Sequence, residues 1–302
     1  MALRLSLVLG VALCVASGAF AQAAYQPEFD LDVVSTRGTD AATQVEVFTA
    51  IPYSNLRFRS VTGGFEAGYA VTVQVYRLSN EGRQQGLVRN QSWEREVTVP
   101  TYDATQAHDT VDRATQALAL EPGRYSVEVQ VEDAASRRSF VRETAVLVGD
   151  YTRGIAMSDP MLLDRYDSSR QQLFPNVGGI IPSNQEQFTL YYEVYAQRAA
   201  DLRVTYVATE EGRVRERPSV RALLGLAERE QEELGTPFVL TEPLRVRNGR
   251  NQAALQIDTE QFDAGDYVFS IRLETTNGQL VAEATKPFSV RWMGLEGQIR
   301  NL

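Results

Sequence analysis

The sequence predicts an all-β protein made of two tandem immunoglobulin-like antiparallel β-sandwiches, the second carrying a short helical insertion. Three observations lead to this prediction. Short segments alternate apolar with polar residues and are rich in Val, Thr and Tyr, glycine-containing turns separate them, and part of the first half recurs in the second. Alternation with a period of two indicates half-buried strands, and many short strands divided by turn signals are typical of sandwiches.

Four segments of the first half have the strand pattern, and turn residues such as Gly63-Gly64 and Pro122-Gly123 lie between them. No segment between them has a helical period, so we expect the first sandwich to span 25–149. The expected strands are 44–53, 68–78, 92–99 and 125–133.

The second half repeats this organisation, and Asn277-Gly278 is a strong hairpin signal between its last two strands. We expect a linker at 150–158, the second sandwich at 159–292 and a tail at 293–302. The expected strands are 187–197, 201–212, 238–247, 251–257, 266–274 and 280–292.

One segment of the first half is repeated in the second half. Glu121 to Val148 aligns without a gap on Asp263 to Val290. A tyrosine follows a glycine turn in both copies. A Tyr at the start of a late sandwich strand often forms a corner, in which its hydroxyl bonds backbone upstream. We therefore interpret Tyr125 and Tyr267 as structural tyrosine corners.

A second match aligns the strand at 69–76 with the segment at 188–195 and leaves extra residues in the second copy. Within them, 219–234 has a helical pattern that Ser219 can cap and Gly235 can end. Anchoring on the Glu-Gly pairs at 81–82 and 211–212 instead would divide the extra length. The helix is predicted, and its place relative to the repeat stays open.

The first 21 residues have the features of a secretory signal peptide. Arg4 is followed by an apolar run from Leu5 to Val15, and Ala19-Phe20-Ala21 has the spacing of a cleavage site. The run is too short to cross a bilayer, and Leu13 before Cys14 disfavours a lipid anchor. We expect a mature chain from about Gln22 without cysteine or transmembrane segment, exported to the periplasm or to the extracellular or outer-envelope surface.

Charge argues against some partners. The chain has 30 lysine and arginine residues and 39 aspartate and glutamate residues, a formal net charge of −9 at pH 7. An acidic surface repels phosphate backbones and anionic lipids. We therefore expect no nucleic-acid partner, and a protein or glycan of the cell envelope in its place.

Motifs for catalysis, metal binding or cofactor binding are not convincing. His108 is the one histidine, and no Gly-x-Ser-x-Gly elbow, phosphate loop or dinucleotide fingerprint occurs. Two clusters of acidic residues carry the oxygen ligands that a metal ion such as calcium binds, but their spacing matches no recognised metal-binding motif. We interpret them as solvated loop residues. They are Asp103, His108, Asp109 and Asp112, and Asp159, Asp164 and Asp167. We predict no catalytic, cofactor-binding or metal-binding residue.

Binding is the more economical hypothesis, and Tyr191 and Tyr195 are its candidate residues. On the strand at 188–195 they alternate with apolar residues and share a face with Thr189 and Glu193, so we expect that face to be solvated. Two exposed tyrosines can stack on a sugar or anchor a partner chain. A cross-strand pair or an interdomain contact explains them equally well.

The order of segments resembles the amino-terminal, strand-rich region of bacterial GWxTD domain-containing proteins. The similarity is carried by VEVFTAIPYSNLRF, GYAVTVQVYRLSNEG, LEPGRYSVEVQVEDAASRR, MSDPMLL, FTLYYEVY, AGDYVFSIRLE and FSVRW. It implies export and a β-rich architecture, and the family carries no established activity to transfer. No GWxTD motif occurs, so we expect either a relative without that domain or a short gene model.

These observations favour an exported, non-catalytic binding or assembly module of the bacterial envelope. A carbohydrate-binding module is the alternative. A carboxylate-dependent glycan hydrolase is a third hypothesis, which requires two acids roughly 5 to 10 Å apart in a cleft.

Overall fold

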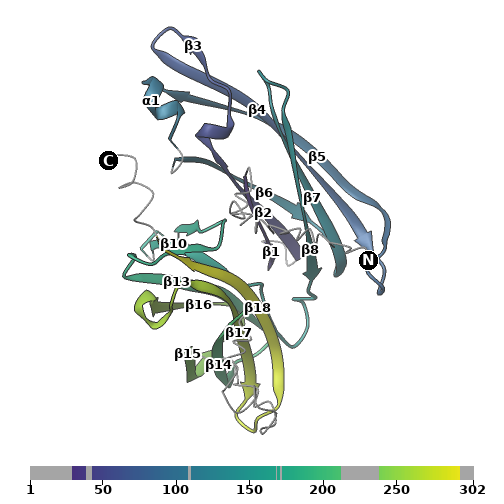
Figure 1. The fold of residues 1–302 in the computed structure, drawn as a ribbon. Helices are drawn as coiled ribbons and strands as arrows, with labels where there is room; N and C mark the ends of the chain where they lie inside the picture. Colours follow the sequence, from purple (N-terminus) through teal and green to yellow (C-terminus); the bar gives the residue numbers. More distant parts are fainter. Residues whose placement is uncertain are drawn as a thin grey trace, which may run out of the picture.

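The computed structural model describes residues 29–38, 43–107, 110–167, 169–170, 172–211 and 238–292, which form an all-β structure of four sheets (Figure 1). The elements other than strands in these ranges are a short helix, α1 (Tyr102–Thr105), and two 3₁₀ turns, at Tyr53–Asn55 and Thr259–Gln261. The predicted signal peptide at 1–21, the helix at 219–234 and the tail at 293–302 lie outside the described residues.

The first sandwich consists of two sheets that enclose one core of Val, Tyr and Leu side chains. One sheet, called here the first inner sheet, contains β1 (Asp30–Arg37), β2 (Thr43–Pro52) and β6 (Val111–Ala119). Its first outer sheet contains β3 (Arg59–Val61), β4 (Gly64–Leu78), β5 (Gln84–Val99), β7 (Gly123–Asp133) and β8 (Ser139–Val148).

The second sandwich repeats this plan around a larger aromatic core. Its second inner sheet contains β9 (Ile155–Met157), β10 (Met161–Asp167), β11 (Gln172–Pro175), β13 (Gln187–Ala196) and β16 (Gly249–Asp258). Its second outer sheet contains β12 (Ile180–Pro182), β14 (Ala200–Glu210), β15 (Phe238–Val246), β17 (Gly265–Thr275) and β18 (Leu280–Arg291).

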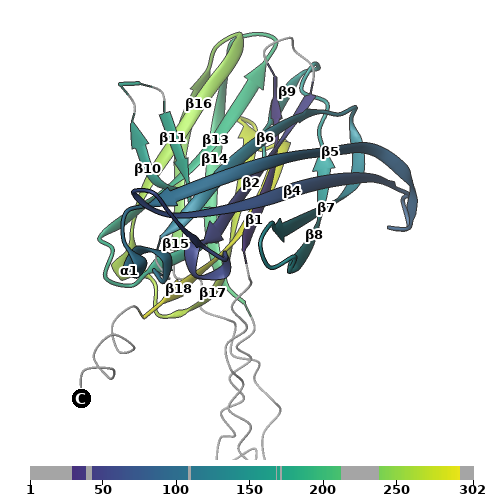
Figure 2. The same cartoon turned by 90° about the horizontal axis from the view of Figure 1, so that it is seen from above.

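The two inner sheets pack against each other, so the molecule has four layers in the order outer, inner, inner, outer (Figure 1). Phe48 and Ala50 of β2 meet Met161, Leu163 and Tyr191 in a third apolar cluster. Seen from above, β4 and β5 run across the direction of β13 and β16 (Figure 2). The central inner strands β2 and β13 are consequently covered on both faces.

The duplicated hairpin predicted from the sequence is present, with the same register in both copies as far as Val131 and Leu273. Gly123 lies opposite Val148 in the first outer sheet, and Gly265 lies opposite Val290 in the second. The second sequence match is wrong, however. The segment 188–195 belongs to an inner sheet, whereas β14 is the strand that pairs with β17 as β4 pairs with β7.

The expected linker at 150–158 is a structural part of the junction between the sandwiches. β9 pairs with β13, and Tyr151 is buried with its hydroxyl 3.0 Å from the carbonyl oxygen of Ser35. Two further hydrogen bonds join Ser35 and Asp159. The Ser35 N–H donates to the Asp159 carboxylate at 2.8 Å, and the Asp159 N–H donates to the Ser35 carbonyl at 3.0 Å. Only a few residues around 152–154 remain exposed.

The single lysine of the sequence joins the two halves. Lys286 on β18 is 9 % exposed, and its Nζ lies 2.6 and 2.7 Å from the two carboxylate oxygens of Asp32 on β1. Both side chains are nearly inaccessible to water, so the attraction between the two charges compensates for the hydration that each has lost.

The contribution of the two tyrosine corners to stability can be tested by substitution. The Tyr125 hydroxyl donates to the Glu121 carbonyl at 3.0 Å, and the Tyr267 hydroxyl donates to the Asp263 carbonyl at 2.9 Å. Replacing either tyrosine by Phe should lower the free energy of unfolding by about 1 kcal/mol, measured by urea titration. Tyr102→Phe, at an exposed position, is the control. Equal stability of all three variants and the parent would refute the corner bonds as stabilising contacts.

Removing one partner of the buried ion pair should be costly. Lys286→Met leaves the Asp32 carboxylate without a counter-ion and should destabilise the fold by about 3 kcal/mol in urea unfolding. The double variant Asp32→Leu, Lys286→Met should recover most of that loss, because no buried charge remains. A double variant as unstable as Lys286→Met would show that packing, not charge, determines the effect.

Candidate functional site

The predicted surface tyrosines are buried. Tyr191 is 0 % and Tyr195 is 1 % exposed, so the expectation that their face of β13 is solvated is wrong. That face lies against the first inner sheet. The Tyr195 hydroxyl accepts the backbone N–H of Arg37 on β1 at 2.9 Å, so the interdomain alternative describes these residues correctly.

Glu193 occupies the centre of this buried contact and is itself 1 % exposed. Tyr191 donates to one carboxylate oxygen at 2.8 Å, Tyr195 donates to the other, and Arg250 of β16 forms an ion pair with it. Burial and the Glu193 carboxylate both raise the pKa of the two tyrosines, which keeps them protonated as donors. Tyr191, Glu193 and Tyr195 fix the junction and are inaccessible to a ligand, whereas the Arg250 side chain is half exposed.

The acidic residues of the two sequence groups that the structure describes do not converge on one site. Asp112 accepts from Tyr69 and pairs with Arg95, Asp159 accepts the backbone N–H of Ser35, and Asp164 pairs with Arg113. Asp103 is exposed on α1, Asp167 accepts bonds from Ser169, and His108 and Asp109 lie outside the described residues. Within the described ranges, no three His, Cys, Asp or Glu side chains are placed to hold a metal ion.

Two carboxyl groups do meet in a shallow hollow on the first outer sheet. The hydrogen bond from Arg59 lowers the pKa of Glu66, and the hydrogen bond between Glu66 and Glu96 raises the pKa of Glu96. Arg59 also forms an ion pair with Glu66, so this carboxylate already has a partner in the hollow.

The candidate binding site is a cleft where the second inner sheet divides. β10 pairs with β13 from Met161 to Leu163 and then, after an irregularity at Asp164, pairs with β11 alone. β13 remains paired with β16 back to Gln187. The separation opens a cleft of about 810 Å³, called here the inner-sheet cleft. Its lining residues are Asp164, Arg165, Tyr166, Gln185, Glu186, Gln187, Phe188, Thr189, Ala254 and Gln256.

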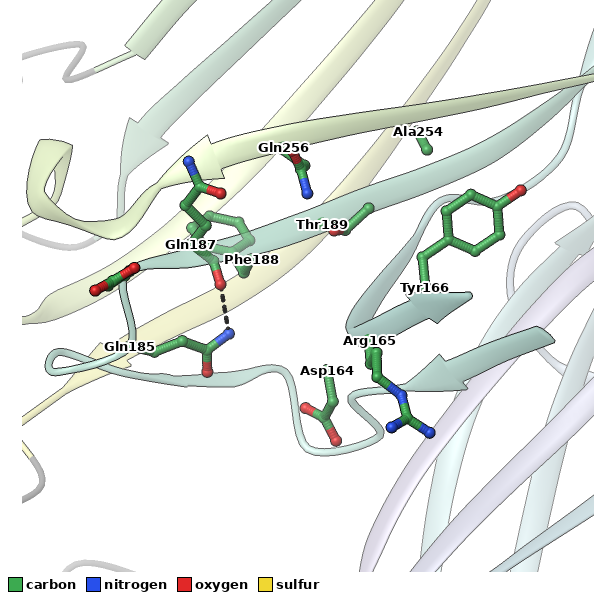
Figure 3. A pocket seen from close by; sticks show the side chains of 10 residues that line it. Asp164, Arg165, Tyr166, Gln185, Gln187, Phe188, Thr189, Ala254 and Gln256 are labelled. Carbon is green, nitrogen blue, oxygen red and sulfur yellow. Dashed lines mark hydrogen bonds between the residues drawn. The ribbon is translucent and has the colours of Figure 1, made fainter. Parts of the chain in front are cut away.

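Three glutamine side-chain amides and the Thr189 hydroxyl belong to the lining (Figure 3). The Gln185 Nε2 donates to the Gln187 carbonyl at 2.7 Å, and the Gln187 Nε2 donates to Asp258 at 2.7 Å. Among the described residues, the Thr189 hydroxyl and the Gln256 amide have no hydrogen-bond partner. These groups can both donate and accept, so they are available to a ligand.

The wall opposite β13 is held by contacts outside the cleft. The Arg165 guanidinium lies 4.0 Å from the ring centre of Phe174, and the Tyr166 ring lies 5.8 Å from the Tyr191 ring. The Asp164 carboxylate binds Arg113 of β6 at 2.9 Å. Burial raises the pKa of Asp164, and Arg113 opposes that change. The buried Tyr191 thus supports the cleft from behind without lining it.

The sequence reading missed this cleft. Its lining comes from three separated segments, and its amides have no recognised motif. The one local signal is the polar run from Asn184 to Gln187 directly before a buried strand. The two tryptophans lie outside this cleft: Trp292 is 79 % exposed, and Trp93 is partly buried against the first core.

Comparisons with known proteins show only distant likeness. No family model matches the chain, and no curated protein matches it. A red sea bream transglutaminase structure has a TM-score of 0.28 and 9% identity, covering 89% of this chain and 32% of that chain. A Bacteroides uniformis beta-glucuronidase structure has a TM-score of 0.29 and 12% identity, covering 82% and 26%. This chain therefore spans about a third or less of those proteins.

Within the part of the chain that the structure describes, no helix has both the length and the apolar character needed to cross a bilayer.

Asp159 makes the junction sensitive to pH. Burial raises its pKa to about 6 from an ordinary value of 3.8, the bond from the Ser35 N–H and the charge of Lys286 lower it, and Asp32 raises it. The folded state therefore binds this proton more tightly than the unfolded state does. Stability should increase as the pH falls from above 6 toward 4.

We expect the free energy of unfolding to increase by about 1 to 2 kcal/mol between pH 7.5 and pH 5. The raised pKa values of Asp30, Glu46 and Asp164 act in the same direction. Asp159→Asn should be more stable than the parent at pH 7.5 and should depend less on pH, as measured by urea unfolding at four pH values. Identical slopes for the two proteins would assign the pH dependence to other groups.

Proposed function

We propose that this chain is a tandem of two immunoglobulin-like sandwiches exported to the bacterial cell envelope, where it acts as a non-catalytic binding or assembly module. The inner-sheet cleft is the observation that carries the proposal. There a rigid β scaffold holds two polar side chains without a hydrogen-bond partner among the described residues, the exposed Gln256 and the largely buried Thr189.

The chemistry of the cleft favours recognition over reaction. Amides and hydroxyls such as those of Gln256 and Thr189 form hydrogen bonds but do not transfer protons near neutral pH. Of the two carboxylates in the lining, Asp164 and Glu186, the first is already bound to Arg113. The cleft therefore has the groups of a binding site.

Other features support the remaining parts of the proposal. The duplicated hairpin and the two corner tyrosines are typical of immunoglobulin-like domains. The residues before Gln22 have the pattern of an export signal. The resemblance to the amino-terminal region of GWxTD domain-containing proteins points to the same compartment and stays a prediction.

Co-purification from the native envelope tests this function. The full-length gene with a carboxy-terminal affinity tag should yield a product that begins near Gln22 and enriches a defined envelope component. Combining Gln187→Ala with Gln256→Ala should reduce that enrichment severalfold, because both amides line the cleft. Gln252→Ala, on the same strand as Gln256 but outside the cleft, should leave it unchanged.

A protein recovered from the cytoplasm with Met1 intact would contradict export. Enrichment that the cleft variants do not change would show that binding uses another surface.

A further inference from the structure

The inner-sheet cleft has features that select among ligand classes. Its charged lining groups are Asp164, Glu186 and Arg165, so carboxylates outnumber the one cation. The chain as a whole carries a net charge of −9. An anionic ligand would meet unfavourable potential both at long range and inside the cleft.

Pairing with an extended peptide is also disfavoured. A peptide could add to β13 only through the backbone groups that β10 leaves free near Gln187. The Gln187 carbonyl, however, already accepts the Gln185 side-chain amide at 2.7 Å. The side chain of the protein occupies the bond that an added strand would need.

The uncharged polar groups of the cleft suit a ligand that carries hydroxyl groups. A side-chain amide has two donors and an acceptor, and a threonine hydroxyl donates and accepts. Thr189 and Gln256 lie directly opposite each other on β13 and β16, and neither side chain has a hydrogen-bond partner among the described residues. Opposite residues of paired strands have Cβ atoms about 5 Å apart, so the two groups can reach neighbouring hydroxyls of one ring.

Tyr166 adds an apolar surface beside these polar groups. Its ring is partly exposed, and the buried Tyr191 ring behind it, 5.8 Å away, fixes its position. An aromatic wall next to amides suits a ligand with both an apolar face and hydroxyl edges, which is the character of a pyranose ring.

We propose that the inner-sheet cleft binds a neutral oligosaccharide, an inference that rests on the proposed binding function. Gln256, Thr189 and Gln187 hold ring hydroxyls by hydrogen bonds, and Tyr166 contacts the apolar face of one sugar unit. The opposed Thr189 and Gln256 set the orientation of the bound ring.

Titration calorimetry with defined neutral hexasaccharides tests this inference. The probes are maltohexaose, cellohexaose, laminarihexaose, mannohexaose and xylohexaose, added to the exported full chain. At least one should bind with a Kd of about 1 mM or tighter. Thr189→Val and Gln256→Ala should each weaken that binding by about tenfold, because each removes hydrogen bonds to the ligand.

Gln252→Ala is the matched control and should retain the parent's affinity. Urea unfolding of each variant, measured in parallel, separates lost affinity from lost folding. No binding of any probe, or binding that neither Thr189→Val nor Gln256→Ala weakens, would overturn the inference. If the envelope component is still enriched through the cleft while every hexasaccharide fails, the binding function stands and the saccharide assignment falls.

Discussion

The face-to-face contact between the two inner sheets determines how the rest of the molecule is arranged. A sheet in an isolated sandwich buries one face and exposes the other to water. Here β13 is buried continuously from Phe188 to Ala196, because the second core covers one face and the first inner sheet covers the other. The same holds for β2, where Val47 faces the first core and Phe48 faces the junction. Unfolding either sandwich would expose an apolar face of the other.

This contact also explains where the buried charges lie. Glu193 sits between the sheets with two tyrosine hydroxyls and Arg250, and Asp32 pairs with Lys286 at the edge of the junction. Buried ion pairs contribute little net stability, because desolvation offsets the attraction between the charges. In this molecule the ion pairs determine the relative position of the two inner sheets. A shift of one sheet relative to the other would leave a buried charge without its partner, so the pairs specify how the two sandwiches dock.

The sequence allowed ten of the strands and both corners to be predicted because their determinants are local, whereas eight strands were not among those expected: β1, β3, β6, β8, β9, β10, β11 and β12. The strand 125–133 alternates along its own length, and the Gly-x-Tyr of the corner lies within a few residues of its acceptor carbonyl. The fate of Tyr191 and Tyr195 depends on a sheet formed more than a hundred residues earlier. Alternating Thr, Tyr and Glu reads as a solvated face unless the covering sheet is known. The mistaken match of 188–195 to 69–76 has the same origin, because alternation identifies a strand without identifying its sheet.

The inner-sheet cleft was unpredictable for a related reason, and its position follows from the junction. β13 stays paired with β16, whereas β10 beyond Leu163 leaves β13 and contacts the first sandwich. Asp164 binds Arg113 of β6, and Tyr166 packs against the third apolar cluster, which includes Phe48 and Ala50 of β2. One wall of the cleft therefore depends on the docking of the two sandwiches, and the opposite wall depends on the second sandwich alone. A ligand that contacts both walls would bind only the docked arrangement, which gives the tandem a role that a single sandwich could not supply.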